Sequence, residues 1–129
     1  MLYSFAKQIK FAKPDIITME NVPRVVNHKV FKDFIKSLKN DGYFVWYGVV
    51  FCPDYGMAQS RSRLVLLASK YGKIEIIPPT HEKNDYKTVR DIIGNLPEIS
   101  AGAVHAGDKL HRSASLSDIN IKRIMASKP

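Results

Sequence analysis

The feature that most restricts the fold is a short apolar run, residues 15–19, set between a helical segment and a sharp turn. Residues 2–12 carry apolar side chains at helical spacing, and Pro14 ends that helix. The run that follows has little polar relief, which indicates a strand buried on both faces, as in a parallel sheet. It ends abruptly at the sequence Glu-Asn-Val-Pro, residues 20–23. A helix followed by such a strand predicts an α/β chain.

The next elements continue this alternation. Residues 28–39 are predicted to form an amphipathic helix, with Asn27 as its N-cap. Strands are predicted at residues 43–51 and 64–68, and a short one at residues 74–77. Together these elements make one half of an α/β sheet. The edge of such a half-sheet lacks the strands that should pair with it.

From Pro78 onward the composition changes, because Pro, Gly, Asn and His become common and apolar runs disappear. Two short helices are predicted here, one opened by the capping pattern at residues 88–91 and one by the pattern at residues 115–118. Residues 97–114 are predicted to be a loop. We therefore divide the chain into a sheet-forming part, residues 1–77, and an irregular helical extension, residues 78–129, which we expect to act as a connector.

The charge balance favours an anionic partner. The formal net charge is +8 and the isoelectric point is near 9.6. Nucleic acid is the commonest partner of such a chain, and a merely soluble basic surface is the alternative.

Several other classes of protein are disfavoured. No apolar run approaches the length of a membrane-spanning helix, and the first residues lack the apolar core of a secretory signal. The single cysteine, Cys52, excludes an intrachain disulfide and argues against a zinc cluster. The four histidines show no metal-binding spacing. A reducing, cytoplasmic setting without membrane or metal is the expectation.

Two groups of polar residues are candidates for chemistry. Glu20 and Asn21 come directly after the first strand, where open α/β sheets place their ligands. The alternative is a loop glutamate that caps a helix or pairs with a lysine. Alternation along a strand would send Gln59, Arg61 and Arg63 to one face, where they could grip phosphate or a base edge. The alternative is an exposed strand start with solvated arginines.

These residues belong to two motifs that resemble those of one family. Residues 14–22, PDIITMENV, resemble the ENV motif of the DNA (cytosine-5) methyltransferases, and residues 54–63, DYGMAQSRSR, resemble their QxRxR motif. The two motifs occur in the family's order, with a glycine-aromatic strand between them. Residues 88–97, TVRDIIGNLP, resemble a further family segment. The resemblance, to bacterial members in particular, runs over nearly the whole chain.

The resemblance implies a fold, a reaction and a set of roles. The fold would be the later half of the Rossmann-like sheet of a methyltransferase that uses S-adenosylmethionine. In this family a cysteine thiolate adds to C6 of a cytosine flipped out of double-stranded DNA, and C5 then takes the methyl group. Glu20 would protonate N3 of the ring and Arg63 would hold O2. Arg61 would contact phosphate or organise the nucleophile's loop, and Asn21 and Gln59 would fix the loops.

The same resemblance implies parts that these 129 residues lack. The glycine-rich turn that binds S-adenosylmethionine and the Pro-Cys nucleophile motif have no counterpart, and Cys52 lies in the wrong place to replace the nucleophile. We therefore expect a segment of a restriction-modification type methyltransferase that is inactive alone. One alternative is a degenerate, non-catalytic segment that binds DNA or a partner chain. Another is an unrelated module that binds RNA or single-stranded DNA through the aromatic residues of strand 43–51.

The predicted half-sheet has consequences for the site and for assembly. Strands 43–51 and 64–68 should pair antiparallel, because the loop between them is too short for a helical crossover. Glu20 and Arg63 should lie close together and buried. The open edge should recruit a second chain, unless the N-terminal helix folds over it.

Overall fold

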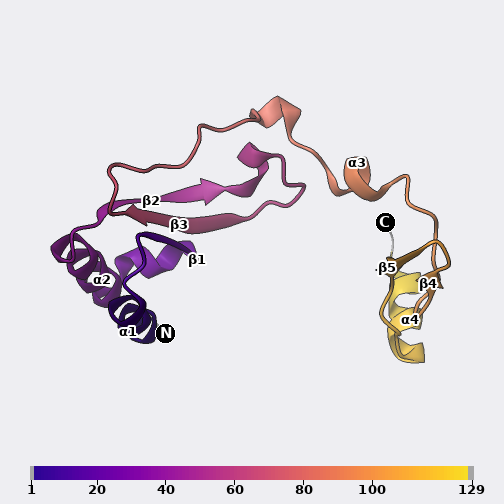
Figure 1. Cartoon of the computed structure of the whole chain (residues 1–129). Coiled ribbons are helices and arrows are strands. Elements are labelled where there is room, and N and C mark those ends of the chain that lie inside the picture. The colour runs from indigo at the N-terminus through magenta and orange to yellow at the C-terminus, as the bar shows by residue number, and fades with distance from the viewer. Residues whose placement is uncertain (1, 128–129) are drawn as a thin grey trace. The chain divides into compact units, whose positions relative to one another are not determined.

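A three-stranded sheet with two helices on one face forms the N-terminal part of the computed structural model, which describes residues 2–127 (Figure 1). The chain divides into two compact units, residues 1–92 and residues 93–129. The helices and strands of the first unit's sheet layer are, in chain order, α1 (Leu2–Ala12), β1 (Ile16–Asn21), α2 (Lys29–Asn40), β2 (Phe44–Phe51) and β3 (Ser62–Ser69). The predicted mixture of helix and strand is confirmed.

The strands are ordered β1-β3-β2, with β3 in the middle and antiparallel to both neighbours. The predicted antiparallel pairing of strands 43–51 and 64–68 is therefore confirmed. Since β3 runs against both neighbours, β1 and β2 run parallel to each other, and the chain between them passes through α2. The loop of residues 52–61 joins the antiparallel strands β2 and β3, whereas the parallel strands β1 and β2 need a helical crossover.

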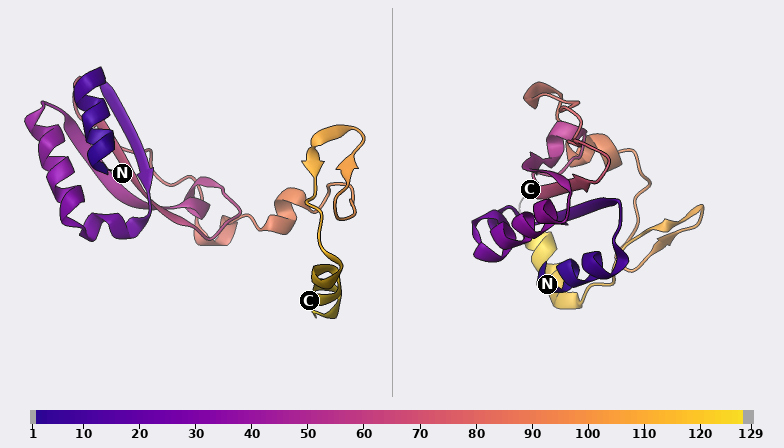
Figure 2. Two further views of the ribbon diagram at one scale, coloured as in Figure 1. Left: turned by 90° about the horizontal axis from the view of Figure 1, so that it is seen from below. Right: turned by 60° about the vertical axis from the view of Figure 1, so that its left-hand side comes forward.

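The core lies between the sheet and the two helices, which cover the same face in both views of Figure 2. Ile17, Leu64, Leu66 and Ala68 point into it from the sheet, and each is at most 4% exposed. From the helices come Leu2, Ile9, Phe31, Phe34, Ile35 and Leu38. We call this side the helix-covered face and the opposite side, which carries Ile16, Thr18, Glu20, Arg63, Val65 and Leu67, the open face.

The prediction that the first strand is buried on both faces is wrong. Ile17 is 4% exposed, but its neighbour Ile16 is 53% exposed. Burial along β1 alternates because the helices of the described chain cover one face only. A strand with one covered face shows this period of two, whatever its composition.

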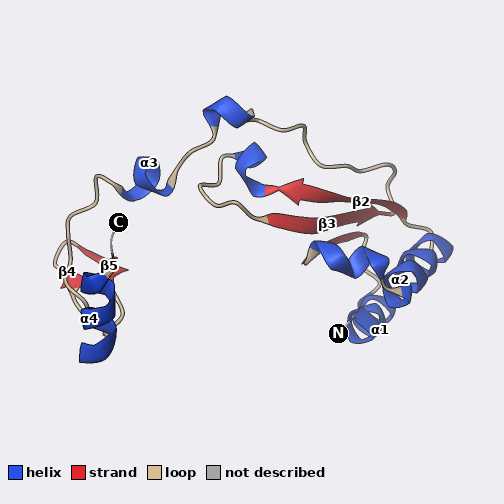
Figure 3. Cartoon of the chain, turned by 180° about the vertical axis from the view of Figure 1, so that it is seen from behind, coloured by secondary structure: helices blue, strands red, loops and turns tan. Residues whose placement is uncertain are grey.

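Two local predictions are also wrong. Asn27 is not the N-cap of α2, because it ends a 3-10 turn, Pro23–Asn27, and His28 takes the cap position without a side-chain hydrogen bond. Residues 74–77 form no strand. They belong to an extended connection that runs from β3 to a 3-10 turn, Lys83–Asp85, and that is drawn as loop in Figure 3.

The helix predicted at residues 88–91 is confirmed as α3 (Val89–Ile93). The hydroxyl and amide of Thr88 both donate to the carboxylate of Asp91 at 2.8 Å, and the Asp91 amide donates back to the Thr88 hydroxyl at 3.2 Å. These hydrogen bonds lower the pKa of Asp91 below its usual value. The capping box read from the sequence is therefore formed.

The second unit contains a small hairpin that the sequence analysis missed. Its strands are β4 (Val104–His105) and β5 (Asp108–Arg112), within the stretch predicted to be a loop. Helix α4 (Asp118–Ala126) follows, with Ser117 as its cap residue and no side-chain cap hydrogen bond, so the predicted capping pattern is not formed.

The division of the chain into a sheet-forming part, residues 1–77, and a connector, residues 78–129, remains a prediction. Among the described residues no helix has the length and apolar character needed to cross a membrane.

Strand β1 is an edge strand in the described part of the chain, because its only pairing there is with β3. We predict that this edge makes the isolated chain self-associate, since unpaired strand edges recruit further strands. Sedimentation equilibrium should show a mass that rises above 14.6 kDa as the concentration increases. Thr18→Lys, which puts a charge on the exposed edge strand, should shift the chain toward monomer, while Gln8→Lys on the exposed side of α1 should not. A constant mass of 14.6 kDa at all concentrations contradicts the prediction.

Candidate active site

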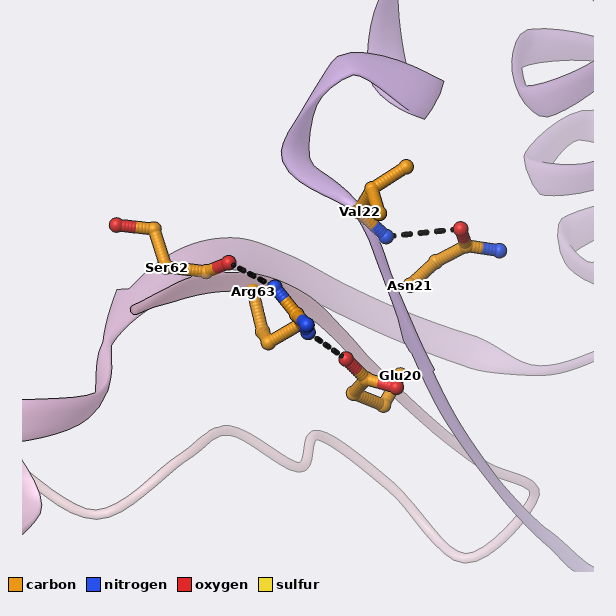
Figure 4. A network of polar contacts seen from close by, with 5 residues as sticks. All are labelled: Glu20, Asn21, Val22, Ser62 and Arg63. Atoms are coloured by element: carbon orange, nitrogen blue, oxygen red, sulfur yellow. Dashed lines mark hydrogen bonds and ion pairs between the residues drawn. The ribbon is translucent and has the colours of Figure 1, made fainter. Parts of the chain in front are cut away.

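The two motif residues Glu20 and Arg63 meet on the open face of the sheet. Glu20 lies near the carboxyl end of β1, and Arg63 lies near the start of β3. Glu20 is paired in register with Val65, so Arg63 is its diagonal neighbour on the same face. Arg63 Nε and Glu20 Oε1 form an ion pair, which Figure 4 shows in close-up. The prediction that these two side chains lie together is confirmed.

The prediction that the pair is buried is wrong for the glutamate. The Glu20 side chain is 60% exposed, whereas that of Arg63 is 20% exposed. Glu20 is exposed for the same reason as Ile16: both lie on the open face of the sheet, whereas the helices of the described chain cover the other face. Arg63 is held further by a hydrogen bond from its Nη1 to the carbonyl oxygen of Ser62, at 2.9 Å. A partly exposed ion pair of this kind contributes about 0–1 kcal/mol to folding stability. The fold therefore does not depend on it.

Asn21 shapes the turn that follows β1. Its Oδ1 accepts a hydrogen bond from the amide of Val22 at 2.8 Å (Figure 4). Pro23 then opens the 3-10 turn, with its ring fixing the backbone where no amide donor is needed. The side chain of Asn21 thus holds the bend directly beyond Glu20.

The prediction that Gln59 and Arg61 share a strand face with Arg63 is wrong. Strand β3 begins at Ser62, so both residues belong to the loop before it, and both are exposed. The base of this loop is closed by a hydrogen bond from the Cys52 amide to the Arg61 carbonyl oxygen, at 2.8 Å. The loop thus projects Gln59 and Arg61 into solvent at the end of the sheet where Arg63 lies.

A set of residues beyond β3 holds the same loop, and the sequence analysis did not connect them with it. Thr80, His81 and Tyr86 all contact Asp54, the first residue of the QxRxR motif segment. The sequence gives one signal at this place: Asp54 precedes Tyr55-Gly56, a pair that favours a turn. It does not indicate which later residues contact that turn.

The larger hollows of the first unit lie away from the ion pair. The largest described, about 420 Å³, is lined by Lys10, Lys13, Lys70 and Tyr43 among others. Two more, of about 400 Å³ and 270 Å³, include neither Glu20 nor Arg63 in their lining. Within residues 2–127, no group of three or more potential metal ligands comes together.

Comparison with known proteins agrees with the two motifs. The family model described as C-5 cytosine-specific DNA methylase matches residues 1–126. The type II methylase M.HgiDII of Herpetosiphon aurantiacus is 49% identical over an alignment covering 100% of this chain and 37% of that protein. The type II methyltransferase M1.HphI of Haemophilus parahaemolyticus is 35% identical over 76% of this chain and 27% of that protein.

Among solved structures, the Entamoeba histolytica methyltransferase EhMeth matches with a TM-score of 0.48 and 28% identity, over 54% of this chain and 22% of that one. The chain spans about a third of the length of the two type II relatives.

Proposed function

The chain belongs to the C-5 cytosine-specific DNA methylases, and from that membership we propose that it is a segment of a bacterial enzyme that methylates C5 of cytosine in double-stranded DNA. The two relatives named above are type II enzymes, which supports the restriction-modification type. The observation that carries the proposal is the meeting of Glu20 and Arg63, which come from two motifs far apart in the sequence.

The sheet is proposed to be the later half of a Rossmann-like methyltransferase sheet. Parallel strands joined through a helix are the repeating unit of such folds, and β1 and β2 are joined in this way through α2, with the antiparallel β3 between them. The free edge of β1 would pair with the first half of the sheet, and a covering layer would close the open face. Such a layer would bury Glu20, which the described residues leave exposed.

The positions of Glu20 and Arg63 fit the chemistry of cytosine activation. N3 and O2 are neighbouring atoms on one edge of the cytosine ring, so two groups that bind them must be neighbours as well. Glu20 would protonate N3, which makes C6 a better electrophile, and Arg63 would hold O2 and stabilise the charge that develops on the ring. The ion pair of the free chain would then open to admit the flipped base between the two side chains.

The remaining motif residues would bind DNA or hold the loops. Arg61 is exposed on the loop before β3, where its guanidinium could contact a phosphate or organise the nucleophile's loop. Gln59, on the same loop, and Asn21, at the turn after β1, would fix the two loops that flank the base. The net charge of +8 would favour the approach of DNA.

S-adenosylmethionine would supply the methyl group when bound. None of the three hollows described above includes Glu20 or Arg63 in its lining. The only cysteine of the chain, Cys52, is partly buried in the 3-10 turn Cys52–Tyr55, and it follows a strand other than that of Glu20. We therefore assign no residue of this chain to the binding site of the methyl donor, and we do not assign the attacking thiolate to Cys52.

The isolated 129-residue chain is accordingly expected to transfer no methyl group to DNA. Without a thiolate at C6 and a bound donor, neither half of the reaction proceeds. The measurement is incorporation of labelled methyl from S-adenosylmethionine into duplex DNA, with the full-length protein that contains the chain as the positive control. Incorporation by the chain alone above a no-protein blank contradicts this expectation.

The second candidate is a degenerate segment that binds DNA or a partner chain without catalysis. The exposure of Glu20 is the observation that favours it, because a flipped base needs a closed pocket, whereas the Glu20 side chain is 60% exposed. The DNA upstream of the codon for Met1 separates the two candidates: an in-frame Pro-Cys motif there indicates a working enzyme. An unrelated aromatic platform is disfavoured, because Tyr43 is buried in the core and the two exposed aromatic residues of β2, Phe44 and Tyr47, lie on opposite faces of the sheet.

A further inference from the structure

The loop of residues 52–61, which carries Gln59 and Arg61, is held by hydrogen bonds from the connection that follows β3. The carbonyl oxygen of Asp54 accepts three hydrogen bonds from that connection: from the Thr80 amide at 2.9 Å, the His81 amide at 3.0 Å and the Thr80 hydroxyl at 3.3 Å. A backbone carbonyl has two lone pairs, so this oxygen is fully engaged by a segment more than twenty residues further along the chain.

Tyr86 holds the same residue through its side chain. The Tyr86 hydroxyl donates to Asp54 Oδ1, and the Tyr86 ring packs on that of Phe51, with centroids 5.8 Å apart at 63°. The hydrogen bond to the carboxylate raises the pKa of Tyr86 above its ordinary value. A hydrogen bond to a charged acceptor is stronger than one between neutral groups, so this contact holds Asp54 more firmly than the backbone bonds do individually.

The turn itself is shaped to receive His81. Gly56 has φ +81°, a left-handed conformation, and its amide donates to the Pro53 carbonyl oxygen at 3.0 Å. A Cβ added to Gly56 would lie 2.9 Å from Cε1 of His81, so the imidazole occupies the space that a side chain would need. The neighbouring Tyr55 donates its hydroxyl to the carbonyl oxygen of Ile77 at 3.0 Å.

We propose that Asp54, His81 and Tyr86 form a clasp that positions the loop 52–61 and thereby sets where Gln59 and Arg61 present their side chains to DNA. The consequence for DNA rests on the proposed function; the ordering of the loop does not. The clasp lies outside the core between sheet and helices, to which none of the three residues belongs. It therefore acts on the loop rather than on the stability of the sheet.

A loop ordered before binding loses less conformational entropy when DNA binds. Without the clasp, the loop would sample other conformations and Arg61 would meet phosphate in only some of them. The affinity for DNA would fall while the sheet stayed intact. Arg63 would be affected less, because it lies within β3 and its position is set by strand pairing.

Hydrogen exchange of the 129-residue chain tests the clasp directly. The amides of Met57, Thr80 and His81 are the reporters, because each donates to a carbonyl in or beside the turn. Tyr86→Phe removes one hydroxyl and should speed their exchange roughly 10- to 100-fold, as expected for one hydrogen bond to a charged group. The amides of β3 should be unchanged. The matched control is Tyr71→Phe, which removes a tyrosine hydroxyl bonded to Asp15 at 2.7 Å and should leave the three reporters unchanged.

The contact between Gly56 and His81 gives a second, independent test. Gly56→Ala should loosen the loop both because of its positive φ and because of the close approach of His81. His81→Ala removes the obstacle, so Gly56→Ala should accelerate the reporter exchange less in a His81→Ala background than in the wild type. If Tyr86→Phe and Asp54→Asn leave the exchange of Met57, Thr80 and His81 unchanged, the clasp is refuted.

Fluorescence anisotropy with a double-stranded oligonucleotide then tests the consequence. Tyr86→Phe should weaken binding roughly three- to tenfold, and Tyr71→Phe should change it less than twofold. If the exchange accelerates but the affinity stays the same, the clasp orders the loop and the assignment of that loop to DNA is wrong. If the wild-type chain binds no DNA, the proposed binding function of the chain fails, while the exchange measurement still decides whether the clasp exists.

Discussion

Replacing Glu20 by glutamine in the full-length methyltransferase of which this chain is proposed to be a segment is expected to lower the turnover number for DNA methylation about 10²- to 10⁴-fold, the contribution typical of a positioned general acid. Glutamine keeps the size of the side chain and can still donate a hydrogen bond from its amide, but that amide proton is not acidic enough to be transferred to N3 of cytosine. The measurement is the steady-state rate of methyl transfer at saturating DNA.

The stability of the protein should not change with this substitution. The pair that Glu20 forms with Arg63 is partly exposed, and such pairs contribute about 0–1 kcal/mol. The midpoint of thermal unfolding therefore serves as an internal check that the loss is chemical. Glu75→Gln, at an exposed glutamate of the loop after β3, is the matched control and should keep the rate within twofold. A Glu20→Gln protein that methylates within threefold of the wild type contradicts the assigned role.

Replacing Leu66 by alanine is expected to destabilise the first unit by about 2–5 kcal/mol, which is the range for a leucine deleted from a packed core. Leu66 is fully buried in the central strand, between Met19 of β1 and Tyr47 of β2. No rearrangement of one neighbour can fill the space, because both adjacent strands and the helix layer border it. Stabilities of small domains are about 5–15 kcal/mol, so the loss is a large part of the total.

The next residue gives the matched comparison for this prediction. Leu67 points to the open face and is only partly buried. Leu67→Ala removes the same atoms and should cost about 1 kcal/mol, because less apolar area leaves contact with protein. Urea unfolding followed by circular dichroism measures both variants. Equal losses for the two substitutions would show that the core does not lie on the helix-covered face.

The sequence predicted the elements with strong periodicity. The spacing of apolar residues located α1 and α2, and the aromatic and β-branched content located β2. The pairing of β2 with β3 followed from the short loop between them. What could not be predicted is the burial of β1 on each face, because that depends on which elements cover the sheet. The order β1-β3-β2 likewise depends on long-range pairing that local composition does not encode.

The elements that were missed or misplaced have local physical reasons. Strand β5 reads Asp-Lys-Leu-His-Arg, a composition with almost no strand preference. It forms because the turn before it brings it back on β4. Residues 74–77 have strand composition but form no ladder, since the described chain offers them no partner strand.

The candidate site was predicted in part. The two motifs and the resemblance they carry placed Glu20 beside Arg63, because the resemblance gives both residues a role on the same cytosine, and the ion pair confirms that they lie together. Gln59 and Arg61 were misplaced, since the loop closes between Cys52 and Arg61 and the strand begins only after it. The clasp was missed altogether. Its residues lie in a stretch of loop composition, where nothing in the sequence pairs Tyr86 with Asp54.

The central claim is that Glu20 and Arg63 act on the same cytosine. A double-mutant cycle on the single-turnover rate of methyl transfer tests it most directly, with wild type, Glu20→Gln, Arg63→Ala and the double variant in the full-length protein. We expect each single substitution to lower the rate about 10²-fold or more. Residues that act as a unit give non-additive losses, so the double variant should be about as slow as the slower single variant. Losses that multiply in the double variant, or a wild-type rate in either single variant, would contradict the claim that the pair forms one cytosine-binding site.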